Sequence, residues 1–169
     1  MKNKFIDIIE QYLDSAGISY VYRDDCDAYE IKTKNSTDKL KETEIMISID
    51  DEYILTYSFL FFSKEIVDKG RFLRLLNKIN LNIENAQFIY IANSNGIDCV
   101  SSIRSYNTIP SIEMIKDSFC SVKRLMEKFS DTITGVAEGE FLSDSALDEL
   151  LKGESSDGVV YPIETAKSN

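Results

Sequence analysis

The sequence predicts an α+β protein in which one antiparallel sheet packs with helices, in the chain order α-β-β-β-α-β-β-α. Three observations support this order. Three stretches carry apolar residues at helical spacing, shorter stretches between them alternate apolar with polar residues as half-buried strands do, and an Asn-Gly step separates two of these shorter stretches. A chain of 169 residues is long enough for one hydrophobic core, so we expect one main domain.

The first element is predicted to be an amphipathic helix near the N-terminus. Its apolar residues recur at intervals of three and four positions, which places them on one helix face. They are Phe5, Ile8, Ile9, Tyr12, Leu13 and Ala16. Gly17 follows them and favours the end of the helix, because glycine readily adopts the left-handed conformation found there.

A three-stranded antiparallel meander is predicted next. Residues 18–23 are expected to be extended, residues 24–27 to turn, and residues 29–33 and 45–49 to form strands with one face in the core. A polar loop is expected at 35–41, and an acidic turn at 50–52. Residues 53–62 are more apolar and rich in aromatic and β-branched residues, which is typical of a strand that pairs on both sides.

A second helix and a hairpin are predicted to follow. Ser63 is a favoured N-cap residue, and apolar positions continue from Ile66 to Ile79 before Asn80 and Asn82 mark the helix end. Gly70 lies inside this helix and indicates a close contact with another helix. Residues 88–92 and 97–103 flank the Asn-Gly step and should form the hairpin.

A long third helix should open at Pro110 and Ser111, with an apolar stripe that runs from Ile115 to Val136. The main domain is therefore predicted to span residues 1–138. Residues 139–169 are a C-terminal extension, with a short amphipathic helix at about 143–152 and a flexible tail from Gly153. The leucines of that short helix either fold back on the domain or dock on a neighbour; they are Leu147, Leu150 and Leu151.

The sequence offers no catalytic, cofactor-binding or metal-binding residues. It has no histidine, which removes the commonest general base, and its three cysteines stand far apart with no ligand spacing. The acidic stretch at 24–27 lacks the glycine and the downstream glutamate of a calcium loop. The glycines form no phosphate-binding motif. We therefore expect a protein that is not an enzyme and needs no cofactor.

The charge and hydropathy of the chain exclude further classes. The formal net charge of −10 disfavours nucleic acid as a partner, and the lysines between positions 32 and 41 are interleaved with acidic residues. No apolar run reaches the roughly 20 residues of a membrane span. The basic N-terminus meets acidic residues at once and does not resemble a signal peptide. We expect a cytoplasmic protein.

The strand at 53–62 indicates a candidate binding surface, because it carries apolar residues on both of its faces. One layer of helices covers only one face of a sheet, so some of the other face should be buried by a second subunit, a partner segment or the C-terminal tail. The candidate protein-binding residues are Tyr53, Leu55, Tyr57, Phe59, Leu147, Leu150 and Leu151.

The order of elements resembles the YbjN family and the fold of type III secretion chaperones across residues 1–138. The resemblance is carried by the leucine-rich stretch 72–80 that ends in Asn80, by residues 88–90, by the turn at Gly96 and by the helix after Pro110. It implies a compact sheet-and-helix domain, commonly a homodimer, that binds extended protein segments or acts as an accessory regulator. The family supplies no catalytic residues.

Three functions remain open on the sequence. The first is a chaperone-like or accessory module that holds a segment of a client protein, by strand addition or in apolar grooves. The second is an acidic immunity-type or inhibitor-type protein, or a structural subunit, that binds a partner through charge. The third is an enzyme of an unrecognised kind, for which no nucleophile, base or metal set can be named. Charge-driven binding should weaken with salt, whereas apolar binding should not.

Overall fold

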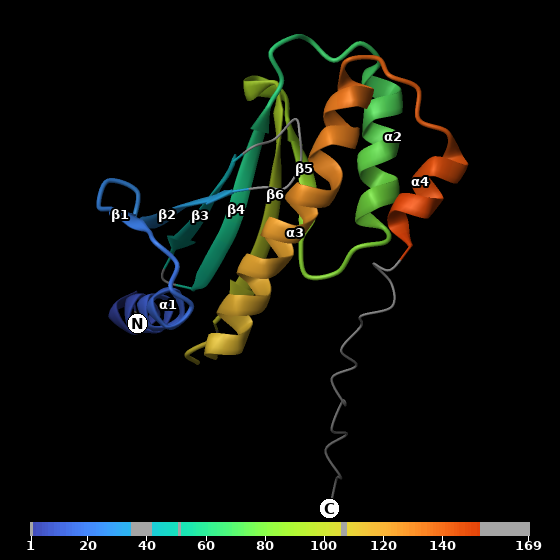
Figure 1. The fold of residues 1–169 in the computed structure, drawn as a ribbon. Coiled ribbons are helices and arrows are strands. Elements are labelled where there is room, and N and C mark those ends of the chain that lie inside the picture. The colour runs from blue at the N-terminus through green and yellow to red at the C-terminus, as the bar shows by residue number, and fades with distance from the viewer. Residues whose placement is uncertain (1, 35–41, 51, 106–107, 153–169) are drawn as a thin grey trace, which may run out of the picture.

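The computed structural model describes residues 2–34, 42–50, 52–105 and 108–152. These residues form an α+β fold with an open, fully antiparallel sheet (Figure 1). The helices are α1 (Lys2–Ser15), α2 (Lys69–Asn80), α3 (Ile112–Ala137) and α4 (Asp144–Leu151), with a short 3-10 turn at Ala92–Ser94. The strands are β1 (Val21–Arg23), β2 (Ala28–Lys34), β3 (Glu42–Ile49), β4 (Tyr53–Phe61), β5 (Gln87–Ile91) and β6 (Gly96–Arg104).

The sheet has the strand order β1-β2-β3-β4-β6-β5. The predicted fold class and the order of the main elements are confirmed, and β4 pairs on both sides as expected, with β3 and with β6. The stretch predicted only to be extended contains the short edge strand β1. The predicted loop at 35–41, the middle residue of the acidic turn and the predicted flexible tail lie outside the described residues.

The helix α3 supplies most of the layer that covers the sheet, and α1 and α2 pack against it. In α1 the predicted stripe is buried at Phe5, Ile9 and Leu13, and Gly17 ends the helix with a φ of +64°. In α3 the side chain of Ser111 accepts a hydrogen bond from the Met114 N–H at 3.2 Å. The whole predicted stripe of α3 is buried, namely Ile115, Phe119, Val122, Met126, Phe129, Ile133 and Val136.

The predicted start of α2 at Ser63 is wrong. The helix begins at Lys69, and the Asp68 carboxylate caps it by accepting a hydrogen bond from the Arg71 N–H at 2.9 Å. The segment between β4 and α2 is instead held by a distant loop, because the Asn95 side-chain amide donates to the carbonyls of Phe62 and Lys64 at 3.2 and 2.7 Å. These carbonyls are therefore engaged outside the helix.

The predicted close helix contact at Gly70 is also wrong. A Cβ built there would meet Asp68 Oδ1 at 3.5 Å and Arg74 Nη1 at 3.6 Å, which are ordinary contacts with side chains from the same region of chain. The tight glycine is Gly96, where a Cβ would lie 2.6 Å from the backbone oxygen of Leu60. The predicted hairpin is confirmed, but the left-handed residue in its turn is Asn95, with a φ of +48°.

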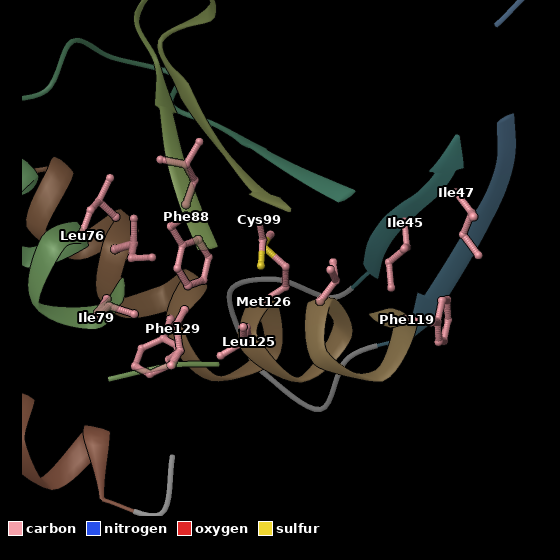
Figure 2. Close-up of a cluster of buried hydrophobic side chains, with 14 of the residues drawn as sticks. Ile45, Ile47, Leu76, Ile79, Phe88, Cys99, Phe119, Leu125, Met126 and Phe129 are labelled. Carbon is pink, nitrogen blue, oxygen red and sulfur yellow. The ribbon is translucent and has the colours of Figure 1, made fainter. Parts of the chain in front are cut away.

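The hydrophobic core lies between the sheet and the helices. Figure 2 shows side chains from both layers meeting there, with Ile45 and Ile47 of β3 facing α3 and Phe88 of β5 lying beside Phe129. The rings of Phe88 and Phe129 pack edge to face, with centroids 6.1 Å apart. The core includes Cys99, and burial raises the pKa of its thiol to about 12. One face of the sheet is thus committed to this core.

One polar contact crosses the core between β4 and α3. The Ser118 hydroxyl donates to Thr56 Oγ1 at 2.9 Å, and both residues are buried. Replacing Thr56 with valine should lower the free energy of unfolding by about 1–3 kcal/mol, because it leaves the buried Ser118 hydroxyl without its partner. Urea denaturation followed by circular dichroism would measure this loss.

A double-mutant cycle supplies the control for this pair. Thr56→Val combined with Ser118→Ala removes both hydroxyls, so it should recover most of the stability lost in Thr56→Val. A double variant whose loss equals the sum of the two single losses would contradict the proposed coupling.

Candidate protein-binding surface

The face of the sheet opposite the helices is called the open face here. On β4, Ile54, Thr56 and Ser58 are buried against the helices, with at most 1% of each exposed. Successive residues of a strand point to opposite faces, so the alternate residues of β4 lie on the open face. They are Tyr53, Leu55, Tyr57, Phe59 and Phe61.

Aromatic rings run in a continuous stripe along this side of β4. The rings of Tyr57 and Phe59 meet edge to face with centroids 5.1 Å apart, and those of Phe59 and Phe61 are stacked at 5.9 Å. Phe61 is 64% exposed and Phe59 is 39% exposed. We call the set Tyr57, Phe59 and Phe61 the aromatic stripe.

Neighbouring strands extend the apolar area on both sides of the stripe. Tyr57 stands opposite Met46 of β3, which is almost fully buried, and Val100 of β6, which is partly exposed. On β5, Ile89 adds a further apolar side chain that is 37% exposed. Aromatic and aliphatic side chains grouped in this way form the kind of patch that protein partners cover.

The structure separates the predicted candidate residues into two groups. Tyr53, Leu55, Tyr57 and Phe59 lie together on the open face. The leucines of α4 lie in the helix layer, where Leu147 and Leu151 are buried in the core and Leu150 packs against it partly buried. Phe61 was not among the predicted residues, although it lies two positions after Phe59 and points to the same face of β4.

The helix α4 is held against α2, as Figure 1 illustrates. Lys78 of α2 binds Asp148 of α4 at 2.8 Å and lies 3.6 Å from Asp144. The Ser143 side chain caps α4 by accepting a hydrogen bond from the Ala146 N–H at 3.2 Å. Because two of its leucines already fill the core, α4 presents little apolar surface to a partner.

The outer edge of β5 is partly closed to strand addition. The side-chain amide of Asn80, the last residue of α2, donates to the Phe88 carbonyl and accepts from the Phe88 N–H, both at 2.8 Å. This amide takes the place that a partner strand would need. The other edge strand, β1, has only three residues. Both edge strands of the described sheet thus leave little room for strand addition.

Charged groups lie unevenly on the open face. At the β1–β2 side, Glu30 accepts from Arg23 Nε at 2.7 Å and lies 3.3 Å from Lys32 Nζ. Hydrogen bonds from these two cations lower the pKa of the Glu30 carboxyl. At the other side, burial raises the pKa of Asp98. Burial is also the main cause of the raised pKa of Tyr57.

The part of the chain that the structure describes contains neither a cluster of metal ligands nor a membrane-spanning helix. Within it, no group of three or more Cys, Asp or Glu side chains is placed to hold a metal ion. No helix in the same residues is long and apolar enough to cross a membrane.

No protein-family model matches the chain, and no curated protein matches it in sequence. Solved structures do match it. A chain of the HopA1–SchA chaperone–effector complex superposes with a TM-score of 0.57 at 14% identity, over 77% of this chain and 95% of that one. YbjN from E. coli gives 0.53 at 17% identity, over 75% and 92%. A chain of the ExsC–ExsE complex gives 0.57 at 10% identity, over 79% and 96%.

These structures share the fold of this chain, and the resemblance predicted from the sequence is confirmed at the level of fold. The fold is that of YbjN and of the matched chains in the HopA1–SchA chaperone–effector complex and the ExsC–ExsE complex. At 10–17% identity the similarity establishes the architecture alone.

Proposed function

We propose that this chain is a non-enzymatic, chaperone-like binding module or accessory regulator, which holds an apolar segment of a client protein on its open face. The observation that carries the proposal is the aromatic stripe, whose rings form a continuous apolar surface that no described helix covers. The similarity to a chaperone–effector complex supports a protein as the partner.

The binding energy would come mainly from apolar burial. Each square ångström of apolar surface removed from water contributes about 25 cal/mol, and aromatic side chains provide large, rigid contact area with few rotatable bonds. The stripe is also prearranged, because its rings already pack against one another along one strand. On binding, the client segment would therefore lose conformational entropy, whereas the side chains of the sheet would lose little.

We also propose that the protein acts as a homodimer in the cytoplasm. A second copy is a competing occupant of the open face, and sedimentation equilibrium separates the two cases. If Phe59→Ser together with Phe61→Ser turned a dimer into a monomer, the open face would be the dimer interface and the proposed client site would be wrong.

The net charge of −10 favours one alternative, an acidic inhibitor-type or structural protein that binds through its negative surface. The two functions differ in their response to salt. Charge-driven binding weakens as ionic strength rises, because exposed charges are screened beyond about 8–10 Å at physiological salt. Binding by the aromatic stripe should persist.

The proposal is tested by pull-down from native cytosol at low and high salt, with mass spectrometry of the bound proteins. The bait is the full chain or its Phe59→Ser/Phe61→Ser variant. A stoichiometric partner should remain bound to the parent chain at high salt. It should bind the variant at least about tenfold more weakly, which corresponds to a loss of about 1.4 kcal/mol in binding free energy.

A matched control removes two exposed apolar residues from the helix side. Leu81 is 85% exposed and Phe141 is 82% exposed, so Leu81→Ser/Phe141→Ser should keep the partner. Equal loss in both double variants would refute a site on the open face. Loss of the partner at high salt from the parent chain would favour the inhibitor-type function.

A further inference from the structure

Asp98 lies within the apolar area on the open face, between β4 and β5. It belongs to β6, where it stands directly opposite Phe59 of β4 on one side and Ile89 of β5 on the other. Both neighbours are more than one-third exposed, so any segment that covers Phe59 and Ile89 would also cover Asp98.

The Asp98 carboxylate has no partner within the described residues. No hydrogen bond or ion pair of that part of the chain reaches it, and burial alone accounts for its raised pKa. Two cations on the open face, Arg23 of β1 and Lys32 of β2, form ion pairs with Glu30. They lie at the opposite edge of the sheet from β5. These two cations therefore do not compensate the charge of Asp98.

Covering the open face raises the free-energy cost of keeping the Asp98 carboxylate charged. A partner that covers it removes the remaining water, and an ionised carboxylate without a compensating partner costs several kcal/mol in an apolar setting. That cost would offset much of the gain from burying the rings. A cation placed opposite the carboxylate removes the penalty and adds a charge-assisted hydrogen bond.

We propose that the client segment carries a lysine or arginine flanked by apolar residues, with its cation on Asp98 and its apolar neighbours on Phe59 and Ile89. This inference rests on the proposed function and names the partner's chemistry. The net charge of −10 acts in the same direction, because it favours approach of a basic segment. Asp98 is then a specificity-determining residue that selects against purely apolar or acidic segments.

The inference is tested with a random peptide library displayed on phage and selected against the full chain, Asp98→Asn and Asp98→Leu. Asp98→Asn keeps the size of the side chain and removes its charge, and Asp7→Asn on the exposed side of α1 is the matched control. Peptides from the parent chain and the control should share a basic residue within an apolar run. Selections on both Asp98 variants should lose that basic residue.

A synthetic peptide from the parent selection supplies the affinity measurement. Replacing its basic residue with leucine should weaken binding to the parent chain at least about tenfold, and should change binding to Asp98→Leu by much less. Fluorescence anisotropy with a labelled peptide measures both.

The outcomes separate this inference from the proposed function. Peptides that need Phe59 and Phe61 but carry no basic preference, or that bind Asp98→Leu more tightly than the parent chain, would overturn the role of Asp98 and leave the client site standing. Peptides that bind Phe59→Ser/Phe61→Ser as well as the parent, or the absence of any selected peptide, would overturn the client site and the inference together.

Discussion

Replacing Phe129 with alanine should lower the free energy of unfolding by about 3–5 kcal/mol. Phe129 is completely buried on α3, and its ring packs against Phe88 of β5. Removing the ring loses its transfer free energy and leaves a cavity between α3 and the sheet that the close-packed neighbours cannot fill fully. Urea denaturation would measure the loss as a lower midpoint with an unchanged slope.

The same substitution at Phe61 is the matched control. Phe61 is 64% exposed on the open face, so Phe61→Ala should change stability by no more than about 0.5 kcal/mol. Its effect should appear in client binding. A large stability loss in Phe61→Ala would mean that the open face is part of the folded core, which would contradict its assignment as a free surface.

Replacing Leu147 and Leu151 together with alanine should lower the free energy of unfolding by about 4 kcal/mol, at the lower end of the range for two buried leucines. Both residues belong to α4 and are no more than 7% exposed, and they join the same core as α2 and α3. Their position at the edge of that core lets neighbours relax, which is why the lower end applies. Thermal unfolding should show a clear drop in melting temperature.

Leu81→Ala is the control for the leucines of α4, because Leu81 is 85% exposed just after α2 and its truncation should leave the melting temperature unchanged. A Leu147→Ala/Leu151→Ala variant that melts like the parent chain would show that α4 does not contribute to cooperative folding. The C-terminal extension would then be energetically separate from residues 1–138.

Much of the secondary structure could be predicted from the sequence, because it depends on residues that are close along the chain. The buried stripes of α1 and α3 follow a helical repeat, and β4 shows the composition of an interior strand. Local signals also placed the Ser111 cap and the turn after β5. The placement of Tyr53, Leu55, Tyr57 and Phe59 on one face could be predicted for the same reason, since strand residues alternate between faces.

The start of α2 was decided by tertiary structure. Ser63 had the chemistry of a cap, but the side-chain amide of Asn95, 31 residues from Lys64, donates a hydrogen bond to the Lys64 carbonyl. No local pattern reports a contact at that separation. The tight packing at Gly96 has the same origin, because its neighbour Leu60 belongs to a different strand.

For the candidate binding surface, the sequence by itself determined that β4 carries apolar residues on both faces, and the tertiary structure decided which face remains open. It also placed Leu147 and Leu151 in the core and set Asp98 between Phe59 and Ile89. The physical reason is that periodicity specifies which side chains share a face, whereas the pairing of distant strands and the docking of helices determine what each face meets.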